Sequence, residues 1–138
     1  MTTGQRNASA YLEAKVLSSS REDLVPLLYE HLCANLRRAA AQIEAGDIEG
    51  KAASLDRATG IVFELLASLD FEAGGDLAAR LAALYSFFAS EISAASRTLD
   101  RQRLERVTNM VASLHEAWRQ AAAKVKGRAE ADRGQGAA

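Results

Sequence analysis

The sequence contains few of the residues that interrupt helices or cross-link a chain. Among 138 residues there are one proline and one cysteine, and aromatic residues make up 6%. The single cysteine, Cys33, leaves no second thiol for an internal disulfide, and its apolar neighbours favour a small buried side chain over a reactive thiol. With so little proline and a hydrophobic fraction of 49% rich in alanine and leucine, an all-α protein is expected.

An excess of charge of one sign and long apolar runs are also missing. The formal net charge is -1 and charged residues are spread along the chain, so neither a nucleic-acid partner nor an acidic solvating tail is predicted. No uncharged stretch approaches the ~18 residues of a membrane span, and the first residues lack the pattern of an export signal. We therefore expect a single-domain cytoplasmic protein without membrane insertion.

Apolar residues recur at helical spacing in four segments, 24–43, 48–69, 77–95 and 104–125. The connections near 46–47, 71–76 and 98–100 are short, which predicts an antiparallel up-down four-helix bundle. We expect residues 1–20 to be a short amphipathic cap segment and residues 21–123 to be the bundle. Residues 124–138 contain three glycines and no clear apolar periodicity, which predicts a disordered tail. Leu66 and Leu84 are expected in the core.

Aspartates stand where three of the helices are expected to begin. Asp47, Asp76 and Asp100 can each accept from the free amides of a first helical turn. The start of the first long helix has two interpretations. A cap among the serines at 18–20 would place Pro26 within the helix and bend it slightly, whereas a cap at Asp23 would place Pro26 third, where it is tolerated.

Residues for catalysis or metal binding do not converge in the sequence. His31 and His115 are the only histidines, and neither follows a glutamate at the spacing used in di-iron bundles. His31 and Cys33 are two residues apart, so on a helix they face different directions and cannot act as a base and nucleophile pair. We expect no enzyme, no metal and no cofactor.

The stretch LDFEAGGDLAARLAALY, residues 69–85, has two adjacent glycines that could indicate a ligand loop. No lysine follows them as a phosphate-binding loop requires, and the positions of a calcium loop lack two of their acids. The stretch therefore predicts a helix corner, in which Gly74 and Gly75 end one helix and Asp76 begins the next. Why a corner should need two glycines is left open by the sequence.

The apolar residues outnumber those that the four helical stripes require. The surplus lies beside the stripes and consists of Leu27, Ile61, Phe63, Leu65, Phe71, Tyr85 and Phe87. Such residues can widen the core, or together they can form an apolar groove that receives a partner helix. On the second interpretation Leu65→Glu should weaken partner binding without lowering the melting temperature.

Over roughly residues 8–120 the sequence resembles the FliS family of flagellar secretion chaperones. The landmarks are AYLEAKVLSSSREDL (10–24), LLYEH (27–31), GDIEGKAASL (46–55), IVFELLASLDFEAGGDLAARLAALY (61–85) and LHEAW (114–118). Three positions depart from the family pattern. Arg21 replaces the proline of a Ser-Pro pair, Glu30-His31 replaces Asp-Gly, and Ser86 stands where an acidic residue is usual.

The resemblance implies a chaperone that binds the disordered C-terminal segment of flagellin, prevents its premature polymerisation and delivers it to the flagellar type III export gate. It also implies that the N-terminal segment lies over part of the client groove, although this segment could simply cover the core. The expected partner-binding residues are Tyr11, Val16, Leu17, Leu27, Tyr29, Ile61, Leu65, Phe71, Tyr85 and Phe87. The alternative is a structural or regulatory bundle that self-associates, as a homodimer for example.

Overall fold

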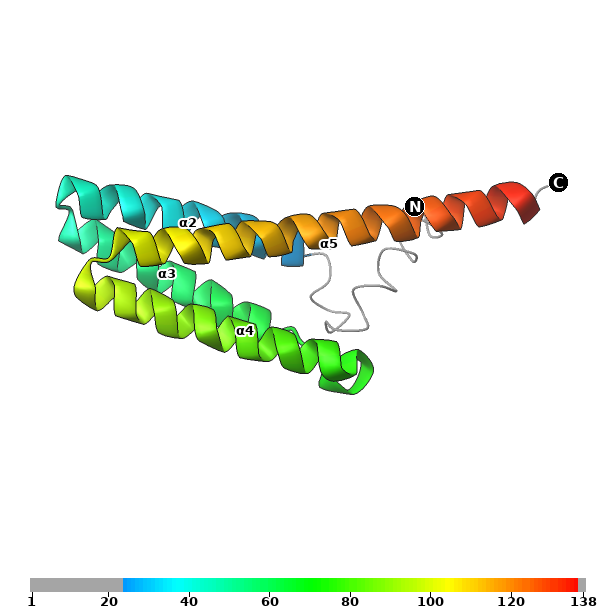
Figure 1. Ribbon diagram of the computed structural model, residues 1–138, viewed down its shortest axis with the longest axis horizontal. Coiled ribbons are helices and arrows are strands. Elements are labelled where there is room, and N and C mark those ends of the chain that lie inside the picture. Colours follow the sequence, from blue (N-terminus) through cyan, green and yellow to red (C-terminus); the bar gives the residue numbers. More distant parts are fainter. Residues whose placement is uncertain (1–23, 137–138) are drawn as a thin grey trace.

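The structure is a computed structural model that describes residues 24–136. Its helices in chain order are α2 (Val25–Ala45), α3 (Ile48–Ala67), α4 (Phe71–Thr98) and α5 (Arg101–Gly136). Successive helices run in opposite directions, and α2 and α4 each pack against α3 and α5 (Figure 1). The predicted all-α, up-down four-helix bundle is confirmed. The predicted cap segment, residues 1–20, lies outside the described residues.

One apolar core joins the four helices. Its largest wholly buried side chains are Tyr29, Tyr85, Phe88, Leu32, Leu36, Leu65, Ile92, Leu104, Val62 and Val107. Cys33 is buried as expected, and burial raises the pKa of its thiol while Arg37 partly offsets that rise. Leu66 and Leu84, which the sequence places in the core, are only partly buried and pack against its edge.

The ends of α2, α3 and α5 follow the sequence signals. Asp47 and Asp100 accept the backbone N–H three residues further on, at 2.9 and 3.1 Å, so both predicted N-caps are confirmed. Gly46 ends α2 in the left-handed region at φ 76°, which glycine adopts without steric strain. Helix α2 starts late, as one alternative predicts, and the alternative of an internal bend is wrong. Its N-cap is Leu24 rather than Asp23, without a side-chain cap bond, and Pro26 is its second residue.

Helix α4 begins earlier than predicted, and a different aspartate caps it. The carboxylate of Asp70 accepts the N–H of Ala73 at 3.0 Å, while Asp76 makes no side-chain hydrogen bond with any described residue. Gly74 lies within the first helical turn, because its N–H donates to the carbonyl of Asp70. Gly75 alone leaves helical geometry, at φ 53° and ψ -129°, and produces a kink. The corner assigned to residues 74–76 is therefore a kink within α4.

Helix α5 extends further than the sequence predicts. It continues to Gly136, through most of the segment for which a disordered tail is expected. Alanine, lysine, arginine and glutamate are strong helix formers, and the packed first half of α5 supplies the nucleus that an isolated helix lacks. Propensity therefore extends the helix where no apolar periodicity marks it.

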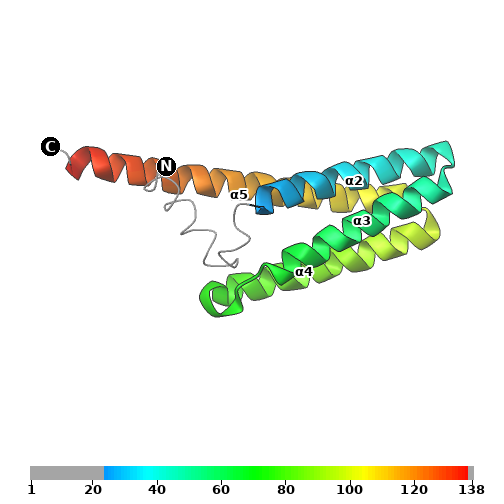
Figure 2. The ribbon, with the colours of Figure 1, turned by 180° about the vertical axis from the view of Figure 1, so that it is seen from behind.

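The arrangement of the helices is asymmetric. Near the α4–α5 connection the two helices lie close together, and they diverge toward the other end of the bundle (Figures 1 and 2). None of the four described helices combines the length and apolar character that a membrane span requires. No group of three or more metal-binding side chains gathers within the part of the chain that the structure describes.

Candidate functional site

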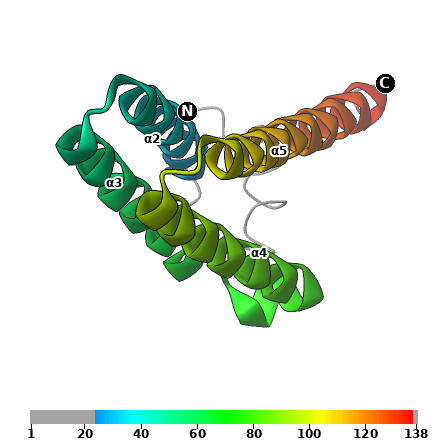
Figure 3. The ribbon, with the colours of Figure 1, turned by 60° about the vertical axis from the view of Figure 1, so that its left-hand side comes forward.

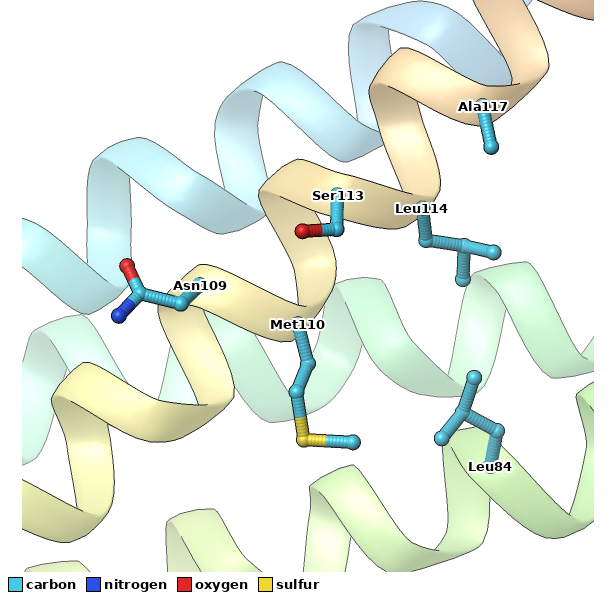
Figure 4. A pocket seen from close by; sticks show the side chains of 6 residues that line it. All are labelled: Leu84, Asn109, Met110, Ser113, Leu114 and Ala117. Carbon is cyan, nitrogen blue, oxygen red and sulfur yellow. The ribbon is translucent and has the colours of Figure 1, made fainter.

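An apolar groove runs along the divide between α4 and α5. It consists of two hollows, about 480 and 220 Å³ in volume, that share Leu114 and Ala117. Figure 4 shows Leu84 of α4 facing Met110 and Leu114 of α5 across the first hollow. We refer to both hollows as the α4–α5 groove, which is lined by Leu77, Leu81, Leu84, Asn109, Met110, Ser113, Leu114, Ala117, Trp118 and Ala121.

The groove follows from residue size as well as from the divergence of the helices. On α5, Met110, Leu114, Ala117 and Ala121 recur in steps of three and four, the spacing of one helix face. Two of these four residues are alanines, so the wall recedes where a larger side chain would fill the space. The surface that remains is apolar and long enough for a helix of about three turns, or about 16 Å from residue 110 to 121.

Two large apolar residues of the groove are exposed to solvent. Leu77 is 50% exposed and Met110 is 39% exposed, although both lie among other apolar groups. Single exposed apolar residues are ordinary, whereas aligned apolar grooves are the kind of surface at which proteins often bind partners. The arrangement suits an amphipathic helix that inserts its apolar face.

Polar contacts hold the closed end of the groove. Arg103 of α5 and Glu91 of α4 form an ion pair with Nε and Oε2 3.4 Å apart. This Nε is buried and has no hydrogen-bond partner, so the contact is one of charge without hydrogen-bond geometry. The ammonium of the buried Lys51, on α3, donates to the carbonyl of Ser96 on α4 at 3.1 Å and to its hydroxyl at 3.3 Å. These contacts fix α4 to α3 and α5 at one end.

An aromatic cluster supports the wide end. The hydroxyls of Tyr29 and Tyr85 share a hydrogen bond of 2.6 Å, and the indole Nε1–H of Trp118 donates to the Tyr29 hydroxyl at 3.0 Å. His115 stacks on the Tyr29 ring with centroids 5.6 Å apart. Burial raises the pKa of Tyr85 to about 12, although its bond to Tyr29 partly offsets that rise. The network therefore fixes Trp118, which forms part of the groove wall.

The structure corrects the expected position of three partner-binding residues. Tyr29, Leu65 and Tyr85 are wholly buried in the core, so they are not exposed groove residues. Ile61 is partly buried and packs against the core. Leu65 lies on the inner face of α3, where the spacing from Val62 continues the buried stripe. The surplus apolar residues at these positions widen the core.

The other expected partner-binding residues divide between the surface and the undescribed part of the chain. Leu27, Phe71 and Phe87 are exposed, but none of them lines the α4–α5 groove. Tyr11, Val16 and Leu17 lie outside the described residues. The position of these six residues on a binding surface thus remains a prediction.

A separate hollow lies between α3 and α4. Phe63, 55% exposed, lines it together with Leu55, Asp56, Thr59, Ala89, Ile92, Ser93, Ser96 and Arg97. Its walls carry two charges and several hydroxyls, whereas the α4–α5 groove is almost entirely apolar. The α4–α5 groove is therefore the better site for an apolar helix face.

Most groove residues are ones that the sequence assigns to buried stripes. Leu77, Leu81 and Leu84 continue the stripe of α4, and Leu114 and Trp118 continue that of α5. Periodicity shows which face is apolar but not whether a neighbouring helix covers it. The alanines at 117 and 121 are the one sequence signal of a gap, because small residues there leave a stripe unfilled.

Comparison with known proteins places the chain in a family. The family model described as flagellar protein FliS matches residues 4–125. The flagellar secretion chaperone FliS of Salmonella typhimurium is 32% identical over 118 residues, which cover 85% of this chain and 87% of that protein. The protein of the same name from Campylobacter jejuni is 33% identical over 112 residues, covering 81% and 88%. The chain therefore belongs to the FliS family of flagellar secretion chaperones.

Proposed function

We propose that this protein is a cytoplasmic export chaperone that binds the C-terminal segment of flagellin in the α4–α5 groove. Binding keeps the flagellin subunit from polymerising early and leaves it in a form that the flagellar type III export gate accepts. The protein acts without catalysis. The observation that carries the proposal is a continuous apolar groove, with exposed Leu77 and Met110, in a chain of the FliS family.

The energetics favour a client that is unfolded before it binds. Complete burial of a leucine or methionine side chain contributes about 1.5–3 kcal/mol, whereas ordering one backbone residue costs about 1–2 kcal/mol. A bound helix therefore needs several apolar anchors along its face, and the groove offers a row of them on each wall. A disordered segment can present these anchors and becomes ordered only on contact.

The test is calorimetric titration of the full chain with a peptide of the flagellin C-terminal region. We expect micromolar or tighter binding with a negative heat-capacity change, the signature of apolar burial. Absence of binding would exclude the proposed function. The groove is tested with the double variant Leu77→Glu, Met110→Glu, whose sites are exposed enough to tolerate charge.

The matched control for that variant is Ile48→Glu. Ile48 is 48% exposed, at the start of α3 and away from the groove. We expect the groove variant to lose binding while the control retains it, with both folded by circular dichroism. Equal binding by the two variants would place the client elsewhere. A stable dimer in sedimentation that the peptide neither binds nor dissociates would instead support self-association.

A further inference from the structure

The second half of α5 stands clear of the bundle. From Ala123 to Gly134, every side chain that the structure describes is exposed, and Figure 3 shows this part of α5 extending past the other helices. We refer to residues 122–136 as the α5 projection. It carries four basic and two acidic residues, a net charge of +2 in a chain whose total is -1. The projection is thus locally basic on an otherwise acidic protein.

The groove face of α5 continues onto this projection. The steps of three and four that join Met110, Leu114, Ala117 and Ala121 lead directly to residues 124 and 128. Residues in such a series share one helix face. The same face therefore changes from apolar to cationic as it leaves the bundle, at Lys124 and then Arg128. Both side chains are exposed.

Lys124 and Arg128 have no ionic partner among the described residues. On the opposite wall, Arg80 of α4 is exposed and lies one residue from Leu81 of the groove. The basic side chains in line with the groove face are therefore those of α5, because Arg80 does not line the groove and the exposed acid Asp76 lies next to Leu77 on the same helix. After Arg128 the next charged residues are the acids Glu130 and Asp132, so the cationic stretch ends at Arg128.

We propose that the segment bound in the α4–α5 groove carries carboxylates just beyond its last apolar anchor, and that these pair with Lys124 and Arg128. The inference rests on the proposed function and adds a charge requirement to it. The partner helix leaves the apolar groove near Ala121 and continues along the projection. Residues 121 and 128 of α5 are about 10 Å apart along the helix. The carboxylates of a helical partner should therefore lie within about seven residues of its last apolar anchor.

Charge reversal tests the inference. The double variant Lys124→Glu, Arg128→Glu is compared with Arg37→Glu, Arg57→Glu, which changes the net charge equally at exposed positions on α2 and α3. Against the flagellin peptide, we expect the first pair to bind about three- to tenfold more weakly than the second, mainly through slower association. The difference should shrink in 1 M salt, where the screening length falls to about 3 Å.

The outcomes separate this inference from the proposed function. If the unmodified chain does not bind the peptide, the proposed function fails. If it binds, and the two charge-reversal variants bind equally, the projection contributes no charge recognition and the inference is overturned.

Gly127 provides an independent test of the helical projection. A Cβ added there meets nothing within 4 Å, so Gly127→Ala strengthens the helix without a clash. Because a more ordered projection loses less entropy on binding, we expect about two- to fivefold tighter binding of the peptide by Gly127→Ala. Unchanged affinity, with helix content increased in circular dichroism, would show that the partner does not use the projection as a helix.

Discussion

The hydroxyl of Tyr29 on α2 lies 2.6 Å from the hydroxyl of Tyr85 on α4, and it also accepts the indole N–H of Trp118 on α5. One oxygen thus joins three helices at the end where α4 and α5 diverge. A buried polar network of this kind is stabilising only while each member keeps its partners.

Replacing Tyr29 with phenylalanine should therefore destabilise the protein more than replacing Tyr85. Tyr29→Phe removes the partner of the buried Tyr85 hydroxyl and of the partly buried Trp118 indole, and we expect a loss of about 1–3 kcal/mol in the free energy of unfolding. Tyr85→Phe leaves the bond from Trp118 to Tyr29 in place, so the loss should be smaller. Urea denaturation followed by Trp118 fluorescence measures both. Equal losses would show that Trp118 gains little from its bond.

Alkaline pH should weaken the fold through Tyr85. Its pKa is raised to about 12 by burial, whereas an unfolded tyrosine titrates near 10. The protonated form is favoured in the folded state, so this contribution is fully present below about pH 10 and is lost as pH rises through about 12. We expect the free energy of unfolding to fall between those values, and to fall less in Tyr85→Phe. The same slope in both proteins would contradict the assignment.

The two glycines at the start of α4 should respond oppositely to alanine. Gly75 has φ 53° and ψ -129°, a backbone conformation that residues with a side chain rarely adopt. Gly75→Ala should therefore lower the free energy of unfolding by about 1–3 kcal/mol. Gly74 is helical, and Gly74→Ala should be neutral or stabilising by up to about 1 kcal/mol. Thermal denaturation of the two single variants compares them directly. A larger loss at Gly74 would contradict the position of the kink.

Leu65 should behave as a core residue rather than as a surface residue. It is wholly buried, so Leu65→Ala should cost about 2–5 kcal/mol and Leu65→Glu should prevent folding. Phe63, two residues earlier and 55% exposed, is the control, because Phe63→Glu should leave the melting temperature nearly unchanged. If Leu65→Glu folds normally, Leu65 is not a core residue, and the groove position expected from the sequence would be correct.

The order of the helices and several helix ends could be predicted from the sequence because they depend on local chemistry. Asp47 and Asp100 cap as expected, and Gly46 ends α2, since each acts on amides or carbonyls within its own turn. At α4 the prediction is wrong. Asp76 is the cap expected from the sequence, whereas the helix begins at Phe71 and Asp70 accepts the N–H of Ala73.

The site is harder to predict because it depends on distances between helices. Leu65 and Leu77 are both leucines on amphipathic helices, yet one is wholly buried and the other is half exposed. The difference arises where α4 separates from α5, and no local pattern encodes that separation. A small residue such as Ala117 indicates the groove only when the position of the facing helix α4 is known.

Helix α4 is held at both ends of the groove. Lys51 binds Ser96 at the closed end, and about 16 Å along the helix the hydroxyl of Tyr85 is bonded to Tyr29 at the wide end. The part of α4 between these two contacts therefore cannot move without breaking a buried polar contact. We expect the size of the client's apolar side chains, rather than movement of α4, to decide which segments fit.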